Sequence, residues 1–260
     1  MAATAEPILK GVRVLDLTRN IAGAYCCRLF ADYGAEVIVV EPPSGHPLRQ
    51  VGPFLGDEED PERATRWLYL AAGKKSLRLD IEQPEGAELL GGLIAETAVV
   101  VESFAPGHLD SLGLGYRELR RLKRRIVLTS IIAPDPALSF SPEAEAYAGL
   151  EAFAASLLAA FCADAYDIPQ HVEISVQDCL SLAAQLSPKK AREVVGQPDL
   201  RRVAHPQAGA FSLVVPPVSS PAIPWQTQRA PLLGEHNESI LAELRVGADD
   251  LAGLRAKGII

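Results

Sequence analysis

The alternation of short β-branched runs with helically spaced residues is the feature that most constrains the fold of this chain. Residues 11–18 read GVRVLDLT, and residues 21–34 then show helical spacing up to a glycine. A second apolar run, EVIVVEPP at 36–43, is closed by prolines. Two strands joined through a helix lie parallel, because the crossover returns the chain to the same edge of the sheet. We therefore expect a parallel sheet to begin here.

The same alternation continues along the chain. We predict strands at 75–81, 98–104, 126–132 and 171–176, and helices at 84–97, 116–125, from about 142, and at 177–186. Strands separated by helices, with few hairpin signals, predict an α/β fold with an open, mostly parallel Rossmann-like sheet flanked by helices. The turn after the first run reads DLTRNIAGA, so the dinucleotide fingerprint GxGxxG is absent.

The domain organisation predicted from these patterns is one α/β domain over residues 1–260. Residues 1–186 form its Rossmann-like core. Residues 187–230, rich in proline and with short β runs such as AFSLVVPPV, are expected to be an extended connection lying over the domain. Residues 231–260 are expected to end the chain with two short helices, at 237–244 and 247–258.

Charge and composition exclude several classes of function. A net charge of −8 argues against a nucleic-acid surface, which needs clustered Lys and Arg. The basic run at 117–125 is read as the solvated face of a helix. No apolar run approaches the ~20 residues of a membrane span, and no signal sequence is recognisable, so we expect a cytoplasmic protein.

The cysteines predict no metal site and no disulfide. They stand at positions 26, 27, 162 and 179, without CxxC or other ligand spacing. We expect reduced cysteines that serve in packing.

Three segments of the sequence resemble the class III CoA-transferase family, which includes formyl-CoA transferases, carnitine CoA-transferases and α-methylacyl-CoA racemases. They are residues 9–49, 73–119 and 230–241, the last reading APLLGEHNESIL. The resemblance implies the family's CaiB/BaiF-like large domain with a C-terminal return segment. It also implies CoA-thioester chemistry and a homodimer, or pairing with a full-length homologue.

Two parts of the family pattern are replaced in this chain. Family members carry a second, small domain before the C-terminal return, where this chain has only SPKKAREVVGQPDLRR. The family strand equivalent to 126–132 leads into a glycine-rich loop that caps the active site, where this chain has APDPALSFSPEAEAY with no glycine. The resemblance therefore implies a truncated member without small domain or lid.

The resemblance places Glu145 at the position of the family's nucleophile. The family has its catalytic Asp in an Ala-Asp-x-x-Ala-Gly pattern, and this chain has AEAYAG at 144–149. That carboxylate attacks the thioester and passes through anhydride and acyl-enzyme thioester stages. Glutamate is one methylene longer, which moves the oxygens by more than ~1 Å and can cost ~100-fold in rate. Burial of Glu145 would raise its pKa and suit it equally to acid or base catalysis.

A purely structural interpretation of the same acids stays open. Ser141 is a candidate N-cap, and Pro142 would occupy the first helical position. Glu143 and Glu145 would then be acids that the helix dipole favours in the first turn.

The resemblance also implies a set of CoA contacts, which this chain keeps only in part. The implied cofactor-binding residues are Asn20, Ala22, Gly23, Lys74, Lys75, Ser103 and Phe104. The family's Asn-Arg-Asn-Lys-Arg-Ser pattern has become AAGKKS at 71–76, and Val39 stands where the family commonly has a lysine. Because CoA carries several phosphates, loss of these charges predicts a weakened site.

Three histidines are candidates for a functional role. His236, in the C-terminal signature, is a candidate catalytic residue, with a capping or surface role as the alternative, and a pair of Glu145 with either His236 or His46 would suit proton transfer. His46 and His205 stand in polar turns and are expected to be solvated.

Two classes of function follow from the sequence. The first is a truncated class III CoA-transferase-like enzyme that acts on an acyl-CoA or a related thioester or carbonyl substrate, with Glu145 in place of the family's Asp. Within this class, the fold could instead be repurposed as an isomerase, cyclase or dehydratase of a biosynthetic intermediate. The second is a non-catalytic dimerisation partner.

Overall fold

Residues 6–132, 140–186, 200–214 and 228–260 are described by a computed structural model of the chain. The strands are β1 (Arg13–Leu17), β2 (Glu36–Glu41), β3 (Lys75–Arg78), β4 (Val99–Glu102), β5 (Val127–Ile132), β6 (Gln170–Ser175), β7 (Leu200–His205) and β8 (Gly209–Val214). The helices are α1 (Ile21–Asp32), the 3-10 helix η1 (Pro47–Arg49), α2 (Thr65–Leu70), α3 (Pro84–Ala95), α4 (His108–Ser111), α5 (Tyr116–Leu122), α6 (Pro142–Tyr166), α7 (Val176–Leu186), α8 (Asn237–Glu243) and α9 (Ala248–Ala256).

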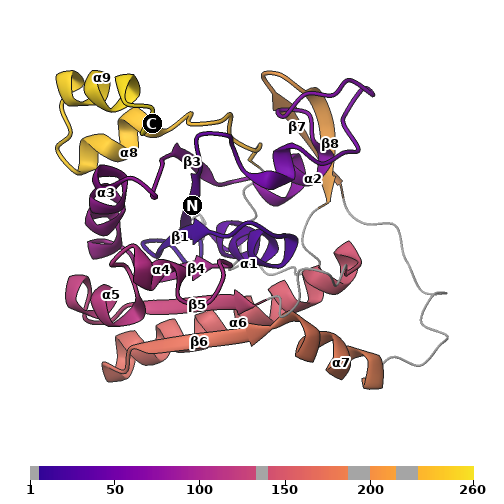
Figure 1. Cartoon of the computed structure of the whole chain (residues 1–260). Coiled ribbons are helices and arrows are strands. Elements are labelled where there is room, and N and C mark those ends of the chain that lie inside the picture. Colours follow the sequence, from indigo (N-terminus) through magenta and orange to yellow (C-terminus); the bar gives the residue numbers. More distant parts are fainter. Residues whose placement is uncertain (1–5, 133–139, 187–199, 215–227) are drawn as a thin grey trace, which may run out of the picture.

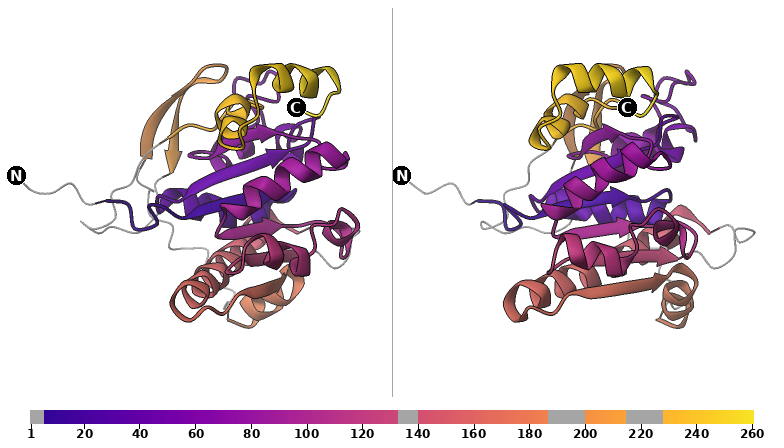
Figure 2. Two further views of the ribbon diagram at one scale, coloured as in Figure 1. Left: turned by 90° about the vertical axis from the view of Figure 1, so that its left-hand side faces the viewer. Right: turned by 60° about the vertical axis from the view of Figure 1, so that its left-hand side comes forward.

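The first six strands form one parallel sheet in the order β3-β2-β1-β4-β5-β6, which confirms the predicted fold class. Figure 1 shows the sheet running from β3 at the top to β6 at the bottom. Successive strand residues face opposite sides: Val14 packs among α1 and α6, whereas Leu15 packs among α3 and α5. Helices therefore cover both faces, as Figure 2 shows from the side. This double cover explains why the inner strands read as continuous apolar runs.

The region expected to be an extended connection contains a hairpin. Within 187–230, strands β7 and β8 pair antiparallel, and Val203 and Leu213 pack on Ala72 beside α2. Residues 187–199 and 215–227 lie outside the described residues, as do 133–139 of the segment expected to lack a lid. The two expected C-terminal helices are confirmed as α8 and α9.

Helix α6 corrects one expectation about membranes. In the described part of the chain, this helix is long and apolar enough to cross a membrane by length and composition. The sequence argument missed this because α6 carries acids near its start, whereas its later turns are alanine- and leucine-rich. The helix packs on α1 and on strands β5 and β6, and core helices commonly pass the same test.

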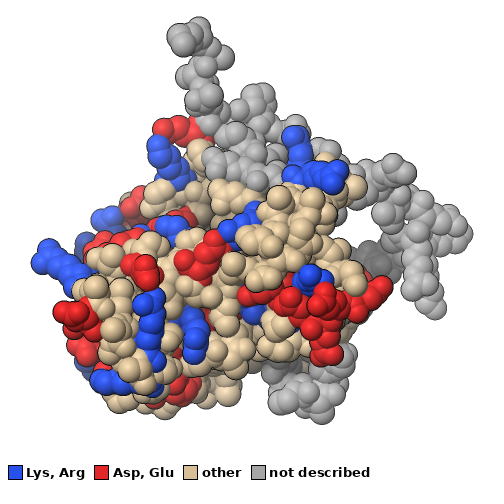
Figure 3. Space-filling model, turned by 90° about the horizontal axis from the view of Figure 1, so that it is seen from above, with Lys and Arg blue, Asp and Glu red and all other residues tan. Residues whose placement is uncertain are grey.

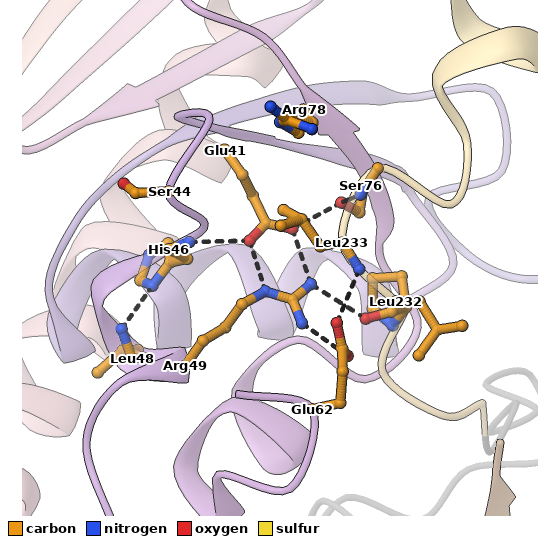
Figure 4. Close-up of polar contacts among 12 residues, drawn as sticks. Glu41, Ser44, His46, Leu48, Arg49, Glu62, Ser76, Arg78, Leu232 and Leu233 are labelled. Carbon is orange, nitrogen blue, oxygen red and sulfur yellow. Dashed lines mark hydrogen bonds and ion pairs between the residues drawn. The ribbon is translucent and has the colours of Figure 1, made fainter. Parts of the chain in front are cut away.

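A buried ion pair fixes the end of β2 to the C-terminal segment (Figure 4). Arg49 donates from Nε and Nη2 to the Glu41 carboxylate at 2.7 and 2.9 Å, and both side chains are fully buried. Ser76 donates to Glu41 at 2.6 Å, and Arg49 also donates to the Pro231 carbonyl at 3.2 Å. The return segment is thus held against β2 and β3 by charged hydrogen bonds.

His46 and His205 are buried, so the expectation that they are solvated was wrong. The Nδ1 atom of His46 accepts from the Leu48 amide, and that of His205 accepts from the Gln207 and Ala208 amides. Turn amides thus bond one nitrogen of each ring, whereas the Nε2 atoms of both are buried without a hydrogen-bond partner among the described residues. Burial lowers the pKa of His46 to about 4.

Other surface and packing expectations are met. Cys26 and Cys27 are buried, and Cys162 and Cys179 are partly buried. The arginines of the 117–125 run are exposed. Acidic and basic side chains are interspersed on the face seen from above in Figure 3.

Candidate functional site

Glu145 leaves its own helix and binds the start of another. Its Oε2 accepts a hydrogen bond from the Ile21 amide at 3.1 Å, and the Ala22 amide also donates to its carboxylate. The next amide, of Gly23, donates to the Asn20 side chain at 2.9 Å, which makes Asn20 the N-cap of α1. A helix N-terminus carries unpaired N–H groups and partial positive charge, so it favours an anion. Here the bound anion is the carboxylate of Glu145.

Two glycines allow this close approach. A Cβ on Gly149 would lie 2.4 Å from the Ala22 carbonyl oxygen, so only glycine lets α6 lie this close to α1. A Cβ on Gly23 would lie 2.3 Å from the Thr18 side chain, so glycine also lets α1 begin directly above β1. The glycine four residues after Glu145 therefore has a packing role: it sets the distance between the carboxylate and the α1 amides.

The structure separates Glu143 from Glu145. Ser141 caps α6 by accepting from the Ala144 amide, and Pro142 takes the first helical position, as predicted. Glu143 is exposed at this helix start, where the dipole favours an acid. Glu145 is half-buried and faces α1, so the first-turn interpretation accounts for Glu143 but not for the contacts of Glu145.

Burial raises the pKa of Glu145 above its ordinary value. The hydrogen bonds from Ile21 and Ala22 and the charge of Arg66 act in the opposite direction without cancelling this effect. The carboxyl group can therefore be protonated at a higher pH than a solvated glutamate. Such a group is suited to proton transfer as well as to nucleophilic attack.

A hollow of about 280 Å³ lies beside the start of α1, and Glu145 itself is not among the residues that line it. Ile21, which binds Glu145, and Ala146, which follows it, are among the residues that line the hollow. Its other walls come from α1, α2 and the first turn of α6, and they include two tyrosines and one residue of each charge, Arg66 and Glu143. A small molecule can thus lie next to the α1 N-terminus.

Most of the expected CoA contacts meet at this edge of the sheet. Asn20, Ala22 and Gly23 begin α1, and the Arg19 amide donates to Ser103 Oγ at 2.8 Å. The Arg19 guanidinium lies 5.3 Å from the centre of the Phe104 ring. The end of β1 and the end of β4 are therefore joined here. The Arg19 guanidinium also donates to the Leu17, Thr18 and Val40 carbonyls, which holds it against the end of β1.

The two lysines expected to bind CoA lie apart from these other expected contacts. Lys74 is buried, and its Nζ donates to Asp16 at 2.8 Å and to the Ala24 carbonyl at 2.9 Å. Lys75 pairs with Glu36, where β2 and β3 begin, so it lies at the opposite end of the strands from Asn20. Neighbouring residues at a strand start point in opposite directions, which divides this pair. The expected CoA set is corrected accordingly: Lys75 is not part of this cluster, and the Lys74 charge is already neutralised.

His236 is also placed away from Glu145. It extends the outer edge of β3, where its amide donates to the Ser76 carbonyl and its Nδ1 accepts from the Ser76 amide. β3 lies two strands from β1, which is roughly 10 Å across the sheet. The structure therefore does not form the expected His–Glu pair. Burial lowers the pKa of His236, in keeping with a neutral ring that supports the β3 edge.

Sequence reasoning missed a second polar cluster, on the other face of the sheet. The Ser130 hydroxyl and His171 Nε2 are 2.9 Å apart, and the Tyr116 ring lies against His171. Glu102 is buried beside them, and burial raises its pKa. These residues line a hollow of about 260 Å³. The residues come from four separate elements, β4, α5, β5 and β6, so no motif in the sequence signals the cluster.

Sequence reasoning also missed Arg66. It is the basic residue of the six-residue helix α2, whose sequence, TRWLYL, is otherwise largely apolar. Its separation of 79 residues from Glu145 along the chain gives no sign that Arg66 lines a hollow beside the start of α1. A lone arginine in an apolar helix was the available signal.

A family model and several relatives match the chain. The model described as CoA-transferase family III matches residues 9–182. Subunit BbsE of the succinyl-CoA:(R)-benzylsuccinate CoA-transferase of Thauera aromatica is 42% identical over 119 residues, 46% of this chain and 29% of BbsE. Human succinyl-CoA:glutarate CoA-transferase is 39% identical over 125 residues, 47% of this chain and 27% of the human protein. The matched part of the chain thus spans less than a third of these relatives' length.

Solved structures show the same fold. A CaiB/BaiF family protein from Brucella suis superposes with a TM-score of 0.72 at 20% identity, covering 91% of this chain and 99% of that one. The hypothetical protein Rv3272 of Mycobacterium tuberculosis gives a TM-score of 0.70 at 19% identity, with the same coverage. At these identities the likeness establishes the architecture.

Proposed function

Because the chain belongs to CoA-transferase family III, we propose that it transfers CoA between an acyl thioester and a free carboxylic acid, with Glu145 as the reacting carboxylate. The observation that carries this proposal is the position of Glu145 on the Ile21 and Ala22 amides. Relatives named as succinyl-CoA-dependent transferases support the choice of an acyl-CoA donor.

The residues around Glu145 have separate tasks in this reaction. The Ile21 and Ala22 amides hold the carboxylate in one orientation, so little reorganisation is needed before it attacks the acyl carbon. The same helix N-terminus stabilises negative charge that develops on an oxygen bound there. The thiol of CoA is the group that leaves the acyl carbon and later attacks the activated carboxylate. Arg19 and Phe104 would hold this end of CoA beside the start of α1.

The test is exchange of a free carboxylic acid into acyl-CoA. Glu145→Gln keeps the side chain's size but removes the nucleophilic oxygen, so we expect exchange to fall by at least about 10³-fold. Glu88→Gln, at an exposed glutamate of α3, is the matched control and should retain the wild-type rate. Equal rates for the two variants would exclude Glu145 as the nucleophile.

Acid or base catalysis on a carbonyl substrate is the second candidate function. The raised pKa of Glu145 favours it, because a proton-transfer group works best when its pKa approaches the working pH. The two functions differ in one observable. Only transfer modifies Glu145 covalently, whereas an isomerase or dehydratase exchanges substrate protons with solvent and leaves Glu145 unmodified.

We also propose that two copies of the chain pair through the outer face of α6. Leu158, Phe161 and Tyr166 are 67%, 59% and 64% exposed there, and exposed apolar groups of this size favour a protein contact. Light scattering should then give twice the chain mass. Leu158→Glu should give the single mass, and a monomeric wild-type protein would contradict the proposal.

A further inference from the structure

We propose that two copies of the chain join through β6, whose outer edges pair antiparallel with Val172 opposite its own copy. The two six-stranded sheets then form one continuous sheet. This inference rests on the proposed pairing of two copies beside α6, which it makes specific by naming the strand and its register. It is independent of the transferase proposal.

The two edges of the sheet differ in what covers them. Along β3, the Ser76 amide donates to His236 Nδ1. The Arg78 amide likewise donates to the Asn237 side chain, so the C-terminal segment pairs with that edge. Among the described residues, β6 pairs only with β5. Because an open edge presents unpaired N–H and C=O groups, β6 is the place where another strand can extend the sheet.

β6 lacks two features that commonly keep an edge strand single. Its sequence, QHVEIS, contains no proline or lysine, and its register with β5 runs without a bulge from Gln170 to Ser175. The strand lies at the end of the sheet farthest from β3 (Figure 1), and α6, with its exposed apolar side chains, packs on it. A two-fold axis perpendicular to the sheet would place both copies of α6 on the same face, on either side of the seam.

This two-fold axis restricts the register of the two strands. It keeps each face of the sheet on the same side in both copies, so opposite residues must share a face and one residue must lie opposite its own copy. His171 and Glu173 are exposed on one face, whereas Val172 and Ile174 pack on the α6 side. With the axis at Val172, His171 of each copy lies opposite Glu173 of the partner subunit. The bond of His171 Nε2 to Ser130 leaves its Nδ1 for this contact.

The neighbouring registers leave the charges unmatched. With the axis at Glu173, the two copies of this acid would face each other, and like charges directly opposite are destabilising. With the axis at His171, Glu173 would lie opposite Pro169, which has no N–H to donate. The axis at Val172 also brings two β-branched side chains together on the α6 face, a favourable cross-strand pair. The sequence of β6 is thus complementary to its own copy.

The experiment reverses and restores the charges across the seam. His171→Glu places acids opposite each other at both positions, so it should raise the dissociation constant of the dimer about 10- to 100-fold in analytical ultracentrifugation. His171→Lys keeps opposite charges and should stay within about threefold of wild type. Ala242→Glu, at an exposed residue of α8 beside β3, adds the same charge away from β6 and is the matched control. His171→Lys combined with Glu173→Lys should also dissociate, but an equimolar mixture with His171→Glu should form dimers.

Val172→Cys tests the register directly. Opposite Cα atoms in an antiparallel pair lie ~4.5–5.5 Å apart, a distance that a disulfide can span. Under mild oxidation, Val172→Cys should therefore give a covalent dimer. The two copies of Ile174 lie four residues apart along the seam, about 13 Å, so Ile174→Cys should not exceed the wild type, whose own four cysteines give the background.

The outcomes separate this inference from the pairing through α6. A dimer that His171→Glu leaves intact, while Leu158→Glu gives the single mass, would keep the α6 contact and overturn the role of β6. A dimer that dissociates with His171→Glu but not with Leu158→Glu would support β6 and contradict the α6 contact. A monomeric wild type would contradict both. None of these measurements depends on acyl exchange, so the transferase proposal is tested separately.

Discussion

Replacing Gly149 with alanine tests whether the contact between α6 and α1 sets the site. The added Cβ would lie 2.4 Å from the Ala22 carbonyl oxygen and 3.2 Å from Tyr25 Cβ. Since carbon and oxygen normally stay beyond ~3.4 Å, α6 would have to withdraw from α1 by about 1 Å. The obstacle is backbone, so no side-chain rotation relieves it.

The magnitude follows from two opposing effects. Alanine in a helix interior is more favourable than glycine by roughly 1 kcal/mol. Overpacking costs ~1–3 kcal/mol, and an immobile carbonyl places this site in the upper part of that range. We therefore expect a net loss of about 1–2 kcal/mol, with Tm lower by ~2–4 °C for each kcal/mol. A 1 Å shift of Glu145 should also reduce the exchange rate by ~100-fold.

Urea denaturation of Gly149→Ala and Gly253→Ala provides the comparison. Gly253 lies in α9, and a Cβ there would meet nothing within 4 Å. Gly253→Ala should therefore stabilise the protein by up to about 1 kcal/mol. If Gly149→Ala is as stable as wild type and keeps its activity, the close contact between α6 and α1 does not position Glu145, and the reasoning is refuted.

Three further predictions concern buried charges and can be measured by the same denaturation. Glu41→Gln should cost about 3–5 kcal/mol, because Arg49 would keep a buried charge without its main partner; a loss below ~1 kcal/mol would contradict this. Lys74→Met should cost a similar amount by leaving the Asp16 charge buried, and adding Asp16→Asn to it should recover part of the loss; no recovery would show that the pair is not coupled. His46 has a folded-state pKa of about 4 against an ordinary 6.5, so the unfolded chain binds its proton first as pH falls. Stability should therefore drop between pH 6.5 and pH 4, by up to ~3 kcal/mol, and His46→Asn should flatten that slope.

The parallel sheet could be predicted because its inner strands are buried on both faces. Val37, Ile38, Val39 and Val40 are all buried, which produces an uninterrupted apolar run between turn signals. The hairpin strand β7 (Leu200–His205) gave no such signal, since Val203 and His205 are its only buried residues. The short helix α2 was missed because six residues are too few to show a period.

A site residue could be predicted from the sequence only where it stands in a recognisable pattern of its own. Glu145 was found through its own pattern, but its partner Ile21 lies 124 residues away and donates through the backbone, which no side-chain motif reveals. Lys74 and Lys75 were grouped because both stand in AAGKKS, the segment equivalent to one family pattern, although a strand start sends them in opposite directions. His46 was judged solvated because its turn is polar, whereas its ring is buried and its Nδ1 accepts from the Leu48 amide of the same turn. Because these hydrogen-bond donors are backbone amides placed by the fold, the amino-acid sequence does not reveal them.

Trapping the acyl group on Glu145 tests the central claim most directly. The protein is incubated with an acyl-CoA and hydroxylamine, digested, and its peptides are examined by mass spectrometry. A carboxylate that attacks the thioester becomes an activated acyl derivative, which hydroxylamine converts to a hydroxamate. We expect the hydroxamate at Glu145 in the wild type and not at Glu143. A protein that exchanges acyl groups at full rate while Glu145 stays unmodified would contradict the account.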